Sequence, residues 1–157
     1  MYAHEYIEQF SNVACPQNDI IFVGKAKERE NLILKIESLC KKENLKTDFT
    51  IVKSERDYVT YNDYMKRVFN AKCILDITNE GQTGLTLRFM EALFTHKKII
   101  TNNEFVKKYD FYDERNILVI KNDDITGIRE FLNSPVYEIS EEKIDYYNLE
   151  EWIKRFV

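Results

Sequence analysis

Glycine, proline and cysteine are scarce in this sequence of 157 residues, which holds 4 Gly, 2 Pro and 3 Cys. So little glycine and proline excludes collagen-like and low-complexity chains and indicates long regular elements joined by simple loops. The three widely spaced cysteines form no CxxC motif, so we expect buried free thiols in a reducing compartment. No run of 18 apolar residues occurs, so no transmembrane helix is expected. The polar N-terminus is not a signal peptide.

An excess of positive charge is also missing. The chain has 23 Lys and Arg against 27 Asp and Glu, a net charge of -4. Nucleic acid requires a basic field, so we do not expect it as a partner. Hydrophobic residues make up 44% and charged residues 32% of the chain, a globular composition. The length suits one domain, and we expect it to be soluble and cytoplasmic.

Short apolar runs alternate with amphipathic stretches along the chain. The apolar runs predict five strands, over residues 19–24, 48–53, 73–77, 98–101 and 116–120. The stretches with helical spacing predict helices over residues 27–42, 61–70, 83–95, 123–132 and 141–156. This alternation predicts an α/β fold, a three-layer Rossmann-like domain with a parallel sheet of about five strands, because a parallel connection needs a crossover.

We divide the chain into three parts on this pattern. A lead segment, for which a helix is one option, covers residues 1–18, and the Rossmann-like domain covers residues 19–135. Residues 136–157 are expected to form a C-terminal helix that packs on the same domain. In open parallel sheets, ligands bind outside the carboxyl ends of the strands. Candidate binding residues are therefore sought where predicted strands end.

The segment from Asp76 to Glu91 leaves a predicted strand through a polar turn and enters a predicted helix at Thr83 and Gly84. The unpaired N–H groups at such a helix start form a seat for phosphate or carboxylate. Further candidates lie in the same segment. Gln82 supplies an amide, Thr83 and Thr86 supply hydroxyls, and Arg88 supplies a cation. The carboxylate of Glu91 could accept hydrogen bonds from the hydroxyls of a ribose or a sugar. The alternative is an N-cap at Thr83 with an exposed Arg88–Glu91 pair.

Two more predicted strands end in candidate residues. Gly24 is followed by Lys25 and Arg29, cations that could neutralise a diphosphate, although a solvated helix start is the alternative. Asn102 and Asn103 close the fourth predicted strand, either as ligand contacts or as ordinary turn residues.

Several standard chemical signatures are absent. The sequence has no GxGxxG, no GxxxxGK[ST] and no DxD motif. No Ser/His/Asp set and no metal-ligand cluster is assembled by spacing. Asp76 could serve as a general base or bond the following turn, and we assign no catalytic residue. We therefore expect no metal and no cofactor.

The order of these segments resembles the family of bacterial lipopolysaccharide and capsular polysaccharide biosynthesis proteins assigned as glycosyltransferases. The resemblance covers roughly residues 19 to 122 and is carried by Asp19–Arg29, Tyr61–Tyr64, Ile74–Ile77, Gly81–Leu93, Lys97–Asn103, Tyr109–Tyr112 and Asn116–Ile117. Its most specific part is the stretch GQTGLT-x-R-x-x-EAL. The same stretch is more distantly similar to the donor-binding C-terminal half of two-domain GT-B glycosyltransferases.

The resemblance implies a nucleotide-diphosphate sugar donor, used without a metal in cell-surface polysaccharide synthesis. It implies that Glu91 holds ribose or sugar hydroxyls, that Gly84 and Thr86 meet the diphosphate, and that Lys25 or Arg29 neutralises it. Only about 18 residues precede the first predicted strand, too few for an acceptor half. The chain is then either a fragment of a longer protein or a stand-alone module, which would pair with an acceptor-domain partner or form a homo-oligomer, peripheral to the inner membrane. The alternatives are a non-catalytic nucleotide-binding or scaffold module that needs a partner chain, and a flavodoxin-like or receiver-like signalling domain.

Overall fold

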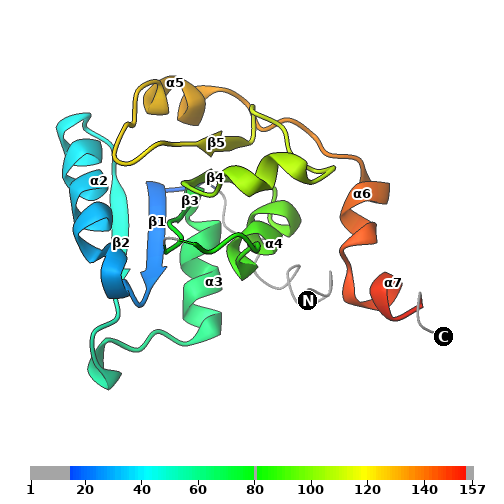
Figure 1. Cartoon of the computed structure of the whole chain (residues 1–157), viewed down its shortest axis with the longest axis horizontal. Helices are drawn as coiled ribbons and strands as arrows, with labels where there is room; N and C mark the ends of the chain where they lie inside the picture. Colours follow the sequence, from blue (N-terminus) through cyan, green and yellow to red (C-terminus); the bar gives the residue numbers. More distant parts are fainter. Residues whose placement is uncertain (1–14, 80, 155–157) are drawn as a thin grey trace.

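A single sheet of parallel strands organises the part of the chain that the computed structural model describes, residues 15–79 and 81–154. The strands lie in the order β2-β1-β3-β4-β5 (Figure 1). Their bounds are β1 (Asn18–Gly24), β2 (Thr47–Ile51), β3 (Ala71–Asp76), β4 (Lys98–Thr101) and β5 (Ile117–Val119). The prediction of a three-layer Rossmann-like fold with a five-stranded parallel sheet is confirmed. What was expected of residues 1–14 and 155–157 lies outside the described residues.

Helices cover both faces of the sheet (Figure 1). The first face packs against α3 (Tyr61–Phe69), α4 (Leu87–Phe94) and α6 (Glu141–Tyr146). The second face packs against α2 (Glu30–Lys42) and α5 (Ile128–Asn133). The remaining helical elements are η1 (Lys27–Arg29), η2 (Glu55–Asp57), η3 (Glu104–Lys108) and α7 (Leu149–Lys154). None of the described helices is long and apolar enough to cross a membrane.

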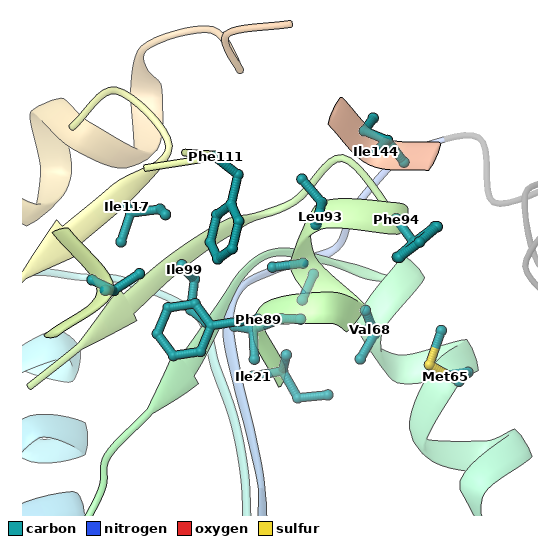
Figure 2. Close-up of a cluster of buried hydrophobic side chains, with 14 of the residues drawn as sticks. Ile21, Met65, Val68, Phe89, Leu93, Phe94, Ile99, Phe111, Ile117 and Ile144 are labelled. Atoms are coloured by element: carbon teal, nitrogen blue, oxygen red, sulfur yellow. The ribbon is translucent and has the colours of Figure 1, made fainter. Parts of the chain in front are cut away.

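Alternation along the central strands produces the two cores, because successive side chains of a strand point to opposite faces. Ile21 of β1 packs with α3 and α4, in the cluster drawn in Figure 2, whereas Ile20 and Phe22 pack with α2 and α5. All three are fully buried. Burying each such side chain stabilises the domain by about 1.5–3 kcal/mol. A run of apolar residues without alternation is therefore the mark of a strand covered on both faces.

The cysteines divide in a way that corrects one expectation. Cys40 lies on α2 and Cys73 on β3, and both are buried free thiols as expected. Cys15 is a free thiol too, but it is exposed. The prediction of buried thiols fails for this one residue, which precedes the first strand and packs under no helix.

Three predicted helices have different bounds in the structure. The helix expected from residue 83 begins only at Leu87, after Thr86 in extended conformation. The helix expected from residue 123 begins at Ile128, after Gly127 with a φ of 79°. The single C-terminal helix is two, α6 and α7, separated by residues 147–148. The first α6 residue to reach the core is Ile144, which is 3% exposed.

Candidate functional site

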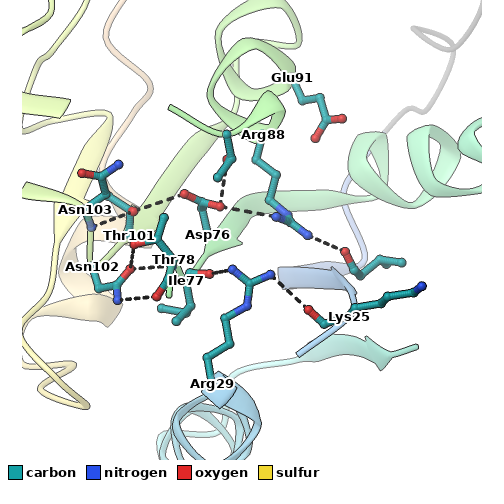
Figure 3. Close-up of polar contacts among 12 residues, drawn as sticks. Lys25, Arg29, Asp76, Ile77, Thr78, Arg88, Glu91, Thr101, Asn102 and Asn103 are labelled. Atoms are coloured by element: carbon teal, nitrogen blue, oxygen red, sulfur yellow. Dashed lines mark hydrogen bonds and ion pairs between the residues drawn. The ribbon is translucent and has the colours of Figure 1, made fainter. Parts of the chain in front are cut away.

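Three neighbouring strands end in polar or flexible residues at one edge of the sheet: β1 at Gly24, β3 at Asp76 and β4 at Thr101 (Figure 3). The chain after β1 enters α2 on one face, and the chain after β3 enters α4 on the other face. The strand order thus reverses between β1 and β3. Such a switch point is where ligands bind in doubly wound sheets.

Asp76 is the centre of this edge. Its carboxylate is fully buried. Oδ1 accepts hydrogen bonds from the hydroxyl of Thr86 at 2.9 Å and from Nη1 of Arg88 at 3.4 Å. Oδ2 accepts one from the hydroxyl of Thr101 at 3.4 Å. Burial raises the pKa of Asp76 above its ordinary value, and the nearby cations of Arg88 and Arg29 oppose that rise without cancelling it.

Arg88 links α4 to the end of β1. Its Nη2 donates to the carbonyl oxygen of Val23 at 2.6 Å, and its guanidinium carbon lies 5.3 Å from the centroid of the Phe22 ring. A Cβ atom on Gly24 would lie only 2.6 Å from Nη2 of Arg88. The absence of a side chain at Gly24 therefore makes room for an arginine of the protein itself.

Arg29 reaches the same edge from the opposite helical layer. Its guanidinium donates to the carbonyl oxygens of Ile77 and Lys25, the latter at 3.1 Å. Its Nε is buried and has no hydrogen-bond partner among the described residues. Burial lowers the pKa of Arg29, and the charge of Arg88 lowers it further, while Asp76 raises it. Two guanidinium groups therefore share the field of one buried carboxylate.

Lys25 adds a third cation to this edge. Its side chain is exposed, and none of the described carboxylates forms an ion pair with it. Its Nζ points away from Arg29 in Figure 3. Gly24, Lys25 and Arg29 are thus neighbours at this edge, and the two guanidinium groups of Arg29 and Arg88 outnumber the one carboxylate of Asp76.

Asn102 and Asn103 hold the loop of residues 77–86. The amide of Asn102 accepts from the backbone N–H of Thr78 at 2.7 Å and donates to its carbonyl oxygen at 3.1 Å. Asn103 donates from Nδ2 to the carbonyl oxygen of Gly84 at 3.2 Å. Both amides are engaged with protein groups, so these two predicted ligand contacts position the loop.

The same clamps explain a correction to the predicted phosphate seat. Gln82, Thr83 and Gly84 are exposed and lie in the loop, not at a helix start. The chain stays non-helical up to Thr86, because Asn102 bonds the backbone of Thr78 and Asn103 that of Gly84. The Thr86 hydroxyl bonds Asp76, which leaves no side-chain cap for α4. The free N–H groups of α4 therefore follow Thr86.

Glu91 also differs from its expected role. It is 3% exposed, and its carboxylate accepts a hydrogen bond at 2.5 Å from the hydroxyl of Tyr64 on α3. Arg88 pairs with Asp76, so the exposed Arg88–Glu91 pair is not observed. Glu91 points toward α3 and not to the loop (Figure 3), so this geometry gives it no access to the hydroxyls of a sugar.

Comparison of the chain with protein-family models, with curated proteins and with solved structures found no match. Among residues 15–79 and 81–154, no group of three or more His, Cys, Asp or Glu side chains could hold a metal ion. A separate apolar cavity lies between α4 and residues 136–139, but it contains none of the charged groups gathered around Asp76.

Sequence reasoning missed two features of this edge. Thr101 and the carbonyl oxygen of Val23 were not considered as partners, because nothing local connects them to Asp76 and Arg88. A concave surface beside Lys25, which includes Tyr58 after β2, was also missed. Only the pairing of β1 with β2 brings Tyr58 and Lys25 together. The one signal available in the sequence was Tyr58, an aromatic residue between two polar stretches.

Proposed function

We propose that this domain is glycosyltransferase-like and binds the diphosphate of a nucleotide-diphosphate sugar at the carboxyl edge of β1 and β3. The observation that carries the proposal is the presence of two guanidinium groups, those of Arg29 and Arg88, beside the single buried carboxylate of Asp76, with the exposed side chain of Lys25 at the same edge. An excess of cations suits a doubly charged anion, because guanidinium and ammonium groups are the main partners of phosphate oxygens. The resemblance of residues 81–93 supports a sugar nucleotide from cell-surface polysaccharide synthesis as its source.

The residues would divide the work as follows. Lys25 is exposed and meets the diphosphate first. Arg29 offers a buried Nε that has no hydrogen-bond partner within the described part of the chain. Asp76 orients Arg88, which keeps the positive charge in place before a ligand arrives. In a transfer reaction, such preorganised cations stabilise the departing diphosphate. An acceptor and a base would come from a partner chain.

One observation favours a second candidate, a nucleotide-binding module without transferase activity. Glu91, which the resemblance gives to the hydroxyls of the donor, is bonded to Tyr64 inside the fold. A receiver-like domain shares the 2-1-3-4-5 strand order. It is disfavoured because β1 ends in Gly24 and a basic Lys25, and because the carboxylate of Asp76 is buried among arginines.

The test is a titration of the domain with UDP, GDP, ADP and their sugars, by calorimetry and thermal shift. A bound donor at 100 times its Kd should stabilise the domain by about 2.7 kcal/mol, which raises Tm by about 5–11 °C for a domain of this size. Lys25→Ala should weaken binding about tenfold or more, because a hydrogen bond to a charged group contributes about 1.5–3 kcal/mol.

The control is Lys42→Ala, the same change of charge in the last turn of α2, away from the carboxyl edge. Both lysines are exposed, so neither variant should unfold the domain. The proposal is wrong if no nucleotide binds, or if Lys25→Ala binds as tightly as Lys42→Ala. Donor hydrolysis or transfer, measured with a candidate acceptor, then separates the enzyme from the binding module.

A further inference from the structure

A concave surface adjoins the charged edge, at the carboxyl ends of β1 and β2. It is lined by Lys25, Val52, Lys53, Ser54, Glu55 and Tyr58. Figure 1 shows the segment between β2 and α3 extending beyond the end of the sheet on this side. Lys25 lines this surface, and its carbonyl oxygen accepts a hydrogen bond from Arg29 of the charged edge. Whatever the charged edge binds can therefore continue onto this surface.

One wall of this surface, formed by residues 52–58, is held rigidly by hydrogen bonds. Oδ2 of Asp57 accepts hydrogen bonds from the backbone N–H of Lys53 at 3.1 Å, and from the backbone N–H and hydroxyl of Ser54 at 2.9 and 3.0 Å. The bonds from Ser54, hydroxyl first, lower the pKa of Asp57. The N–H of Val52 donates to the carbonyl oxygen of Gly24 at 3.0 Å. The wall is thus tied to the end of β1.

Tyr58 is fixed from the other side as well. Val59 packs against the core beneath α3, and Thr60 caps that helix by accepting from the N–H of Asp63 at 3.1 Å. Between these anchors the side chain of Tyr58 is 73% exposed, more than any other large hydrophobic residue in the described chain. A scattered exposed aromatic residue is ordinary. Tyr58 differs because it stands on a rigid wall and shares a concave surface with a free lysine.

We propose that this surface is the nucleoside subsite of the donor, an inference that rests on the proposed function. The ring of Tyr58 stacks on the base, because every base has a π face and aromatic side chains are its usual platform. Glu55 is exposed on the same surface, and its carboxylate accepts hydrogen bonds from the ribose hydroxyls. The resemblance gives this role to Glu91, which is buried and does not fill it. Lys25 joins the nucleoside to the diphosphate at Arg29 and Arg88.

The experiment compares ADP and UDP with inorganic pyrophosphate, by calorimetry on the full chain. Tyr58→Ala should weaken ADP and UDP between about fivefold and about 150-fold, the range of one stacked base, and leave pyrophosphate unchanged. Tyr58→Phe should bind all three as wild type does. Glu55→Gln should bind ADP more weakly than the wild type does. It should bind an ADP analogue that lacks the ribose hydroxyls as tightly as the wild type does. The control is Tyr146→Ala, another exposed tyrosine, on α6.

The outcomes separate the two proposals. If the wild type binds no nucleotide, the proposed function fails. If it binds nucleotides and Tyr58→Ala binds them equally well, only the nucleoside subsite is overturned. The subsite is equally overturned if the wild type binds pyrophosphate as tightly as ADP and UDP, or if Tyr58→Ala weakens pyrophosphate as much as the nucleotides.

Discussion

Replacing Gly24 by alanine should destabilise the domain, because the new methyl group collides with Arg88. The Cβ atom would lie 2.6 Å from Nη2 of Arg88, well inside the contact distance. That nitrogen is held by the carbonyl oxygen of Val23 at 2.6 Å, and Nη1 lies 3.4 Å from Asp76. The guanidinium must move away and weaken one or both of these interactions.

The size of the effect follows from what Arg88 loses. A hydrogen bond made by a charged group contributes about 1.5–3 kcal/mol. Asp76 keeps Thr86 as a partner, so the cost stays below the roughly 3–5 kcal/mol of removing one member of a buried pair. Alanine also restricts the unfolded chain, which offsets about 0.4–1 kcal/mol. We expect a net loss of about 0.5–2.6 kcal/mol and a fall in Tm of about 1–10 °C.

Urea unfolding followed by circular dichroism measures this loss. Gly84→Ala is the matched control, because a Cβ atom there meets nothing within 4 Å. Both substitutions restrict the unfolded chain to the same extent, so that effect cancels in the comparison. In an Arg88→Ala background the collision disappears, so Gly24→Ala should cost nothing further. Equal stability of the two glycine variants, or an equal cost of Gly24→Ala in both backgrounds, would refute the reasoning.

Two further changes probe the buried carboxylates. Tyr64→Phe should lower the free energy of unfolding by about 1.5–3 kcal/mol, because Glu91 is 3% exposed and accepts from that hydroxyl; unchanged urea unfolding would contradict this. Asp76→Asn tests the raised pKa of Asp76. A carboxyl group whose pKa is raised in the folded state stabilises the fold in its protonated form. This contribution to the free energy of unfolding is complete below the ordinary pKa of 3.8 and is lost as the pH rises through the pKa of the folded state. The free energy of unfolding of Asp76→Asn should therefore rise relative to that of the wild type between pH 3 and pH 7. Parallel pH profiles of the two free energies would count against a raised pKa of Asp76.

The layers of the fold could be predicted from the sequence because they depend on local patterns. The apolar run at Ile20, Ile21 and Phe22 predicts a strand buried on both faces, and the structure places it there. The strand order could not be predicted, because it depends on pairings between segments far apart in the chain. The C-terminal break between α6 and α7 was missed as well, since helical spacing continues across residues 147–148.

The sequence predicted which strand ends carry charged residues better than it predicted their contacts. Among the residues sought at strand ends were Arg29 and Arg88, which the structure brings together beside Asp76. The predicted start of α4 was wrong because Asn102 and Asn103 bond the backbone of the preceding loop at Thr78 and Gly84, contacts between distant segments that no local pattern records. Spacing alone also could not show that Glu91, three residues after Arg88, turns toward α3.

Arg29 and Arg88 come from helical layers on opposite faces of the sheet, yet both guanidinium groups act on the same carboxylate, that of Asp76. An anion that draws on both guanidinium groups therefore pulls on two layers that lie on opposite sides of the strands. Occupancy of this edge should be readable as slower amide hydrogen exchange in the first turns of α2 and α4 together. The same link limits change over evolutionary time, because a substitution that suits the edge to a new ligand also alters how the two layers are fastened to each other.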